Sequence, residues 1–92
     1  MHNPLVSIIM PAFNVEDYIM GSIESVIAQS YKNWELLVVD DCSSDQTRII
    51  IEKCALVDDR INPVYLIENT GSPAKAKNKA LPLIEGEFIA FL

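Results

Sequence analysis

Glycine is scarce in this sequence, and its scarcity argues against the best-known nucleotide-binding loops. Only three of the 92 residues are glycines. A P-loop requires GxxxxGK[ST], and a dinucleotide-binding turn requires GxGxxG directly after a strand, but neither pattern occurs. The sequence therefore disfavours a P-loop ATPase and an ordinary dehydrogenase.

Histidine and cysteine are also rare. His2 is the only histidine, so no Ser-His-Asp or Cys-His catalytic group is available. Cys42 and Cys54 form no CxxC motif and have no His-rich neighbour, which argues against a zinc site. We expect two free thiols in a reducing cytoplasm, with Cys54 in the core and Cys42 partly exposed.

Basic residues are also few, and long apolar runs do not occur in the sequence. Seven basic against thirteen acidic residues give a net charge of -6. This balance argues against a nucleic-acid partner or a broad anionic-membrane surface, since both require a basic patch. No apolar run approaches the ~18 residues of a membrane span. Half of the residues are apolar, however, which suits one small domain with one hydrophobic core.

The chain is organised around an apolar run at residues 36–39, which is typical of a strand buried on both faces. Residues 5–10, closed by Pro11, form a second strand-like run. Residues 64–67 and 88–92 predict two further strands.

Three helical segments alternate with these strands, because their apolar residues recur at helical spacing. The expected N-caps are Asn14, answered by Asp17 in a capping box, Ser44, followed by Asp45, and Ser72, followed by Pro73. Pro82 should kink or end the third helix. The expected inner faces are Ile19, Ile23, Val26, Ile27 and Ser30 in the first helix, and Thr47, Ile50, Ile51, Cys54 and Val57 in the second.

The alternation of strands and helices predicts an α/β fold, a three-layer, Rossmann-like parallel sheet with flanking helices. No repeat, linker or second domain is visible. Residues 88–92 run into the terminus without a turn or polar stop. We therefore expect a piece of a longer protein, truncated after the fourth strand.

Three loops follow the carboxyl ends of the first three predicted strands, at residues 11–14, 40–44 and 68–72. Parallel sheets bind ligands in the crevice beyond these ends. Asp40 and Asp41 would lie at its lip, although they could instead merely end a strand and cap a helix. Carboxylates, small hydroxyls and two helix N-termini suit a polar, phosphorylated ligand.

Several sequence blocks occur in the order found in a known enzyme family. They are residues 6–14, 25–29 with 35–45, 69–71 with 77–78, and 86–89. Together they resemble the amino-terminal half of a family 2 glycosyltransferase, an inverting, nucleotide-sugar-dependent enzyme with the GT-A fold. The resemblance covers nearly the whole chain. It implies that residues 1–92 are the amino-terminal, nucleotide-sugar-binding part of such a domain.

The resemblance also implies roles for individual residues. Pro11 and Phe13 would flank uracil and ribose, and Asp41 would accept the imide N–H of the base, since an ionised carboxylate is only an acceptor. For Asp40 a structural role remains as good an interpretation, while Glu16 would hold the ribose or cap the site. The full set of implied substrate-binding residues is Pro11, Ala12, Phe13, Asn14, Glu16, Asp40, Asp41, Lys77 and Asn78.

Lys77 and Asn78 would lie under the diphosphate of the donor. Many relatives have arginine where this sequence has Lys77. Lysine supplies the charge but not the bidentate fork of arginine. Pro82 has no counterpart that the family would lead us to expect.

The reacting centre is expected outside this chain. In the family, the fourth strand leads into an Asp-x-Asp motif that binds Mn or Mg, and the catalytic base follows later. We therefore expect no catalytic residue among the 92, metal ligands beyond Leu92, and no transferase activity from this chain alone. The full-length enzyme would transfer sugar from a UDP-linked donor to a sugar or lipid-linked acceptor, in the cytoplasm or at the inner membrane face. Its expected process is surface polysaccharide synthesis.

Two alternatives belong to other classes of protein. The first is a non-catalytic nucleotide-binding or scaffold module of the same fold. The second is a response-regulator-like receiver domain, which needs an acidic pair after the first strand and a phosphate-accepting aspartate after the third. Residues 11–12 and 68–69 are Pro-Ala and Glu-Asn, which disfavours the receiver domain.

We predict that the 92-residue chain on its own self-associates. The family's strand order would leave residues 88–92 as an apolar strand with an unpaired edge, which is a template for another strand. Acidic repulsion should limit association to small oligomers at low salt, and added salt should increase it. Light scattering after size exclusion, at two protein and two salt concentrations, measures this; a monomer in all four conditions would contradict it.

Overall fold

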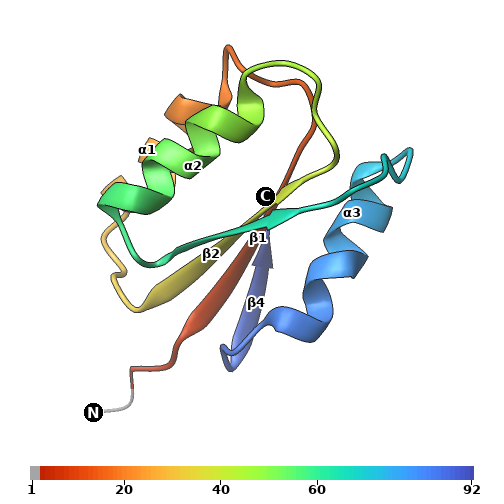
Figure 1. The fold of residues 1–92 in the computed structure, drawn as a ribbon. Helices are drawn as coiled ribbons and strands as arrows, with labels where there is room; N and C mark the ends of the chain where they lie inside the picture. Colours follow the sequence, from red (N-terminus) through yellow and green to blue (C-terminus); the bar gives the residue numbers. More distant parts are fainter. Residues whose placement is uncertain (1–2) are drawn as a thin grey trace.

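The computed structural model describes residues 3–92 as one four-stranded parallel sheet with the order β3-β2-β1-β4 (Figure 1). This confirms the predicted alternation and the parallel sheet. The elements are β1 (Val6–Ala12), α1 (Ile19–Ala28), β2 (Trp34–Asp40), α2 (Thr47–Val57), β3 (Ile61–Tyr65), α3 (Pro73–Ala80), a 3-10 turn (Leu81–Leu83) and β4 (Phe88–Phe91).

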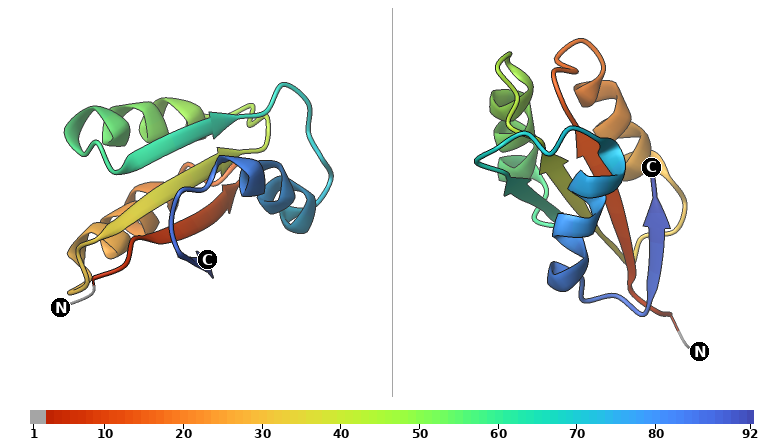
Figure 2. Two further views of the ribbon diagram at one scale, coloured as in Figure 1. Left: turned by 90° about the horizontal axis from the view of Figure 1, so that it is seen from below. Right: turned by 90° about the vertical axis from the view of Figure 1, so that its right-hand side faces the viewer.

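The helices cover both faces of the sheet and give the predicted three layers. Helices α1 and α2 lie side by side on one face, and α3 lies on the other (Figures 1 and 2). The two central strands, β1 and β2, are therefore covered on both faces. Their side chains are apolar at consecutive positions because both faces of a strand point into a core.

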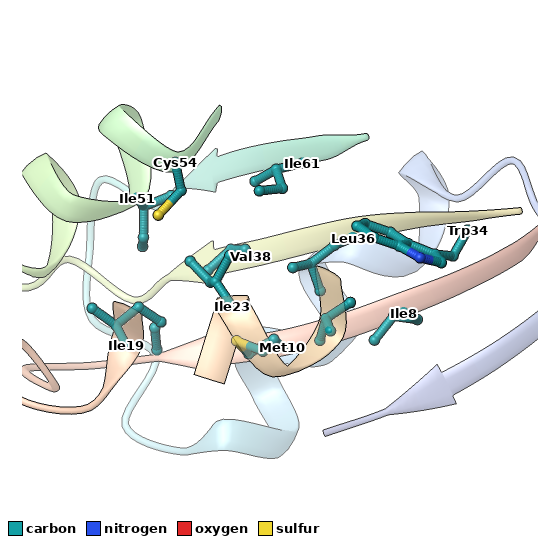
Figure 3. Close-up of a cluster of buried hydrophobic side chains, with 12 residues drawn as sticks. Ile8, Met10, Ile19, Ile23, Trp34, Leu36, Val38, Ile51, Cys54 and Ile61 are labelled. Atoms are coloured by element: carbon teal, nitrogen blue, oxygen red, sulfur yellow. The ribbon is translucent and has the colours of Figure 1, made fainter. Parts of the chain in front are cut away.

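The larger core lies between the sheet and the pair α1 and α2 (Figure 3). Trp34 and Leu36 from β2 meet Ile23 from α1 and Ile51 from α2, and all four side chains are at most 2% exposed. The complete buried cluster is Ile8, Met10, Ala12, Ile19, Ile23, Val26, Trp34, Leu36, Val38, Ile51, Cys54 and Ile61.

A smaller core lies under α3. Ile9, Leu37 and Val39 of the central strands pack against Ala76 and Ala80. These alanines are completely buried. Their small side chains let the backbone of α3 approach the sheet closely, which places the first turn of α3 beside the carboxyl ends of the strands.

Strand β1 is longer than predicted, because it continues through Pro11 to Ala12. The Ala12 carbonyl accepts a hydrogen bond from Asp41 on the β2 side, whereas the Ile9 carbonyl accepts one from Leu92 on the β4 side. Since consecutive residues of a strand form hydrogen bonds with its two neighbours alternately, the nitrogen of Pro11 faces the β4 side. Pro11 therefore removes no hydrogen bond between β1 and β2.

Strand β3 begins earlier than predicted, at Ile61, and ends at Tyr65. The prediction of residues 64–67 was therefore wrong at both ends, and Ile67 is 92% exposed. Pro63 lies inside β3 without disrupting it. The Arg60 carbonyl accepts from β2 and the Leu66 amide donates to β2, so by strand alternation the nitrogen of Pro63 faces away from β2, toward the edge of the sheet.

The predicted starts of the first two helices were wrong. Helix α1 begins at Ile19, after a turn in which the Val15 carbonyl accepts from two following amides. Neither Asn14 nor Asp17 caps it. Helix α2 begins at Thr47, and the carboxylate of Asp45 lies before the helix and accepts from the Thr47 amide at 2.9 Å. Ser44 is therefore not its cap.

The predicted inner faces of the helices hold, with two exceptions. Val57 at the end of α2 is 84% exposed, and Ser30 lies beyond the end of α1. Helix α3 starts as predicted, because the Ser72 hydroxyl accepts from the Lys75 amide at 3.2 Å, and it ends before Pro82 in a 3-10 turn. Among residues 3–92, no helix has the length and apolar character needed to cross a membrane.

Strand β4 has one sheet neighbour, β1, within the described part of the chain. Its apolar side chains at Phe88, Ile89 and Phe91 are between 43% and 58% exposed. This is the edge on which the predicted self-association depends, and association itself stays a prediction.

Gly86 joins the turn before β4 to the amino-terminal ends of β1 and β2. Its amide donates to the Ser7 hydroxyl at 2.8 Å, and that hydroxyl donates to the Glu35 carboxylate at 2.6 Å. The Glu85 amide donates to the same carboxylate oxygen at 2.7 Å. A Cβ at position 86 would lie 2.6 Å from the Ser7 hydroxyl and 2.7 Å from the Leu5 carbonyl oxygen.

We predict that Gly86→Ala lowers the free energy of unfolding by about 1–3 kcal/mol, the usual cost of overpacking, because part of the clash is with backbone. The matched control is Gly21→Ala, on the exposed face of α1, where a Cβ meets nothing within 4 Å. That control should raise the free energy of unfolding by about 0.5–1 kcal/mol. Urea unfolding followed by circular dichroism measures both, and equal effects of the two substitutions would refute the close approach at Gly86.

Candidate nucleotide-sugar site

The parallel pairing of the strands brings three loops to one edge of the sheet. The Asp41 amide donates to the Ala12 carbonyl at 2.8 Å, and the Leu66 amide donates to the Asp40 carbonyl at 2.9 Å. The ends of β1, β2 and β3 are therefore level, and the loops at residues 13–18, 41–46 and 66–72 meet beyond them.

A pocket of about 360 Å³ opens between these loops and the first turn of α3. This volume is within the range of small-ligand sites. Asp41 is the only charged residue among residues 3–92 that lines it, and Phe13, which also lines it, is about half exposed. The lining residues are Pro11, Ala12, Phe13, Val15, Asp41, Asn69, Gly71, Ser72, Pro73 and Ala76.

Asp41 is 4% exposed, and Thr70 holds its carboxylate. The Thr70 amide donates to Oδ1 and the Thr70 hydroxyl to Oδ2, both at 2.8 Å. Asn69 donates its side-chain amide to the Asp41 carbonyl at 2.9 Å. Since each carboxylate oxygen can accept two hydrogen bonds, each retains the capacity for one more donor.

Asp40 does not share this pocket. Consecutive side chains of a strand point to opposite faces, so Asp41 lies on the α3 side and Asp40 on the side of α1 and α2. Asp40 is 2% exposed, and its Oδ1 has no hydrogen-bond partner among residues 3–92. The structure therefore separates the two aspartates that adjoin in sequence.

Asn14 joins the first two loops. Its backbone amide donates to the Ser43 hydroxyl at 3.0 Å, and its side-chain oxygen accepts from the Ser44 amide at 2.8 Å. Asn14 has a φ of 49° and Cys42 has a φ of 60°, a left-handed region that asparagine tolerates well. Cys42 is an exposed free thiol and Cys54 a buried one, as predicted.

Glu16 and Asp45 strengthen the same junction. The Glu16 carboxylate accepts from the Gln46 amide at 3.0 Å, and the Glu16 amide donates to Asp45 at 3.2 Å. Glu16 thus satisfies an amide at the start of α2 and does not line the pocket. Partial burial raises the pKa of the Asp45 carboxyl, but hydrogen bonds from Thr47 and from the Glu16 backbone outweigh it, so this pKa lies below its usual value.

Lys77 and Asn78 point to different sides of α3. The Lys77 ammonium lies 5.3 Å from the centre of the Phe91 ring, on the β4 side. Asn78 lines a second groove, of about 800 Å³, together with Lys75, Lys79 and the residues 66–70. The structure therefore does not bring Asn78 together with the pocket at Asp41.

Sequence reasoning missed Asn69, Thr70 and Ser72 as site residues. Their signal was the Asn-Thr-Gly turn in the loop that follows β3, at the ligand-binding end of the sheet. The Gly71 amide donates to the Asn69 side chain at 2.9 Å, and Gly71 has a φ of 87°, which favours glycine.

The model of the family described as glycosyl transferase family 2 matches residues 7–92. The chain belongs to this family. One family 2 relative is the UDP-Glc:alpha-D-GlcNAc-diphosphoundecaprenol beta-1,3-glucosyltransferase WfgD of Escherichia coli, which is 49% identical over 100% of this chain. The chain spans 35% of the length of WfgD.

Two solved structures confirm the GT-A glycosyltransferase fold. Staphylococcus aureus TarS, residues 1–349 in complex with UDP-GlcNAc, matches 95% of this chain and 25% of its own chain, with 39% identity and a TM-score of 0.87. The mannosyltransferase PcManGT from Pyrobaculum calidifontis, in complex with GDP-Man and Mn2+, matches 97% of this chain and 27% of its own, with 28% identity and a TM-score of 0.86.

Proposed function

We propose that this chain is the nucleotide-sugar-binding part of an inverting glycosyltransferase that takes its sugar from a UDP-linked donor. The observation that carries the proposal is the buried Asp41 carboxylate, which is the only charge that the described part of the chain brings to the pocket and which has acceptor capacity left on both oxygens. Uracil presents one imide N–H, which such an acceptor can bind. The UDP-GlcNAc complex of TarS supports this choice of base.

The end of β1 and the loop that follows it would hold the base and the ribose on the other side of the pocket from Asp41. Pro11, Ala12 and Phe13 line the pocket, and an aromatic ring such as that of Phe13 can pack against a base or a sugar. Asn14 and Glu16 would act indirectly, because their polar groups bond to the 43–46 segment and so fix the shape of this loop. Asp40 would have a structural role on the opposite face of the sheet.

The diphosphate would extend from the pocket toward Lys77. The ammonium of Lys77 lies on the β4 side of α3, over Phe91, and supplies positive charge without the bidentate geometry of arginine. Asn78 lies in the second groove beside Lys75 and Lys79, so the proposal places Lys77, and not Asn78, at the phosphates.

We propose that the divalent cation of the full-length enzyme binds outside residues 3–92. The PcManGT structure contains Mn2+ with its nucleotide sugar. Residues 3–92, however, contain no group of three or more His, Cys, Asp or Glu side chains that could hold a metal ion. We therefore propose that Mn or Mg is bound by other parts of the full-length protein.

The relatives support a proposal for the acceptor and for the process. WfgD is named for a lipid-linked sugar acceptor. We propose that the full-length protein also transfers its sugar to a hydroxyl of a sugar or lipid-linked acceptor, at the inner face of the membrane, during surface polysaccharide synthesis. Transfer of radiolabelled sugar from UDP-glucose or UDP-GlcNAc to extracted lipid-linked acceptors tests this; a full-length protein that binds UDP but transfers neither sugar would support a non-catalytic module.

We predict that Asp41→Asn weakens UDP binding to the full-length protein by about 1.5–3 kcal/mol, or about 10- to 150-fold, because a charged acceptor of a buried N–H is lost. The matched control is Asp59→Asn, which makes the same charge change at an exposed position. Asp59 precedes β3 and so lies at the amino-terminal ends of the strands, away from the pocket. Titration calorimetry measures both, and circular dichroism checks the fold. Equal affinities of Asp41→Asn and the wild type would overturn the assignment of Asp41.

A further inference from the structure

Thr70 supplies two hydrogen bonds to the one charged side chain of the pocket. Its amide and its hydroxyl reach the two different oxygens of Asp41, each at 2.8 Å. A carboxylate held through both oxygens cannot rotate about its terminal torsion without breaking a hydrogen bond. The two lone pairs that remain therefore keep a fixed direction.

The loop that carries Thr70 is itself fixed to Asp41. Asn69 donates to the Asp41 carbonyl at 2.9 Å and accepts from the Gly71 amide at 2.9 Å. Gly71, with a φ of 87°, lets the chain turn into Ser72, the N-cap of α3. The loop at residues 69–72 thus surrounds Asp41 as one hydrogen-bonded unit.

The Thr70 hydroxyl has a choice of acceptors. It lies 2.8 Å from Asp41 Oδ2 and 3.0 Å from the Ser72 carbonyl oxygen, but it carries one proton. The shorter distance favours donation to Asp41. Because Oδ2 can accept a second hydrogen bond, a ligand N–H can bind Asp41 while the Thr70 hydroxyl stays bonded to it, and no buried donor is left without a partner.

We propose that Thr70 is a positioning residue for base recognition, which aims the Asp41 carboxylate at the imide N–H of uracil. This inference rests on the proposed function, because it assumes that Asp41 receives the base. Thr70 itself makes no contact with the donor in this account. Its effect should therefore appear only with a base that carries the imide N–H.

A pair of ligands isolates this effect. UDP carries the imide N–H, and the diphosphate of N3-methyluridine lacks it. The ratio of their dissociation constants measures recognition of the N–H, and the change of this ratio on substitution measures the coupling to Thr70, as in a double-mutant cycle. A residue that merely stabilises the loop would change both affinities by the same factor and leave the ratio unaltered.

The test uses the full-length protein and titration calorimetry with both ligands. In Thr70→Val, which keeps the shape but loses the hydroxyl, we expect the ratio to fall by roughly 3- to 10-fold. This is less than the loss of a whole hydrogen bond to a charged group, because the Thr70 amide still holds Oδ1 of Asp41. Thr70→Ser keeps the hydroxyl and should retain the wild-type ratio. If Thr70→Val does not fold, Thr70→Ala provides the same comparison.

The possible outcomes distinguish failure of the proposed function from failure of the role of Thr70. A wild-type protein that binds both ligands equally would overturn the assignment of the imide N–H to Asp41, and with it the proposed function of this pocket. A wild-type protein that prefers UDP, together with Thr70→Val and Thr70→Ala variants that keep the full preference, would overturn the role of Thr70 alone. Loss of the preference in the valine or alanine variant and its retention in the serine variant would support that role.

Discussion

The parallel pairing of β1 with β2 is the constraint on which the rest of the site depends. It sets Ala12 level with Asp40 and lets the next amide, that of Asp41, bond back to Ala12. The pocket lies where these two strands end, and α3 closes it from the side. Both strands are buried on two faces, so the end of the sheet that carries the site rests on strands whose side chains are held in both cores.

Cross-loop hydrogen bonds perform the task that glycine-rich loops perform in other α/β proteins. Asn14 and Glu16 of the first loop bond to the segment before α2, and Asn69 and Thr70 of the third loop bond to Asp41. Backbone polar groups that would otherwise lack partners at a sheet edge are thereby satisfied. The resulting site is positioned by side chains, which explains how a chain with three glycines can build it.

Much of this architecture could be predicted from the sequence. The apolar run at 36–39, the helical spacing of Ile19, Ile23 and Val26, and the Ser72-Pro73 start of α3 all have local physical causes and proved correct. The family was also recognised correctly from blocks spread along the chain. The strand at 36–39, the inner face of α1 and the start of α3 each depend on residues that lie within a few positions of one another in the sequence.

The incorrect predictions concern residues whose partners are distant in sequence. Asn14 resembles an N-cap, but its side-chain oxygen accepts a hydrogen bond from the Ser44 amide, thirty residues later. Residues 64–67 resemble a strand, yet the register with β2 selects Ile61–Tyr65. Thr70 carried no local signal that would link it to Asp41. The separation of Asp40 from Asp41, in contrast, follows from strand alternation and could have been anticipated.

A crystal structure of the full-length protein with UDP would show directly whether Asp41 binds the base. We expect the uracil N3 atom to lie about 2.7–3.2 Å from a carboxylate oxygen of Asp41, with the Thr70 amide still bonded to that carboxylate. UDP bound in the groove beside Lys75 and Lys79, or uracil facing away from Asp41, would contradict it.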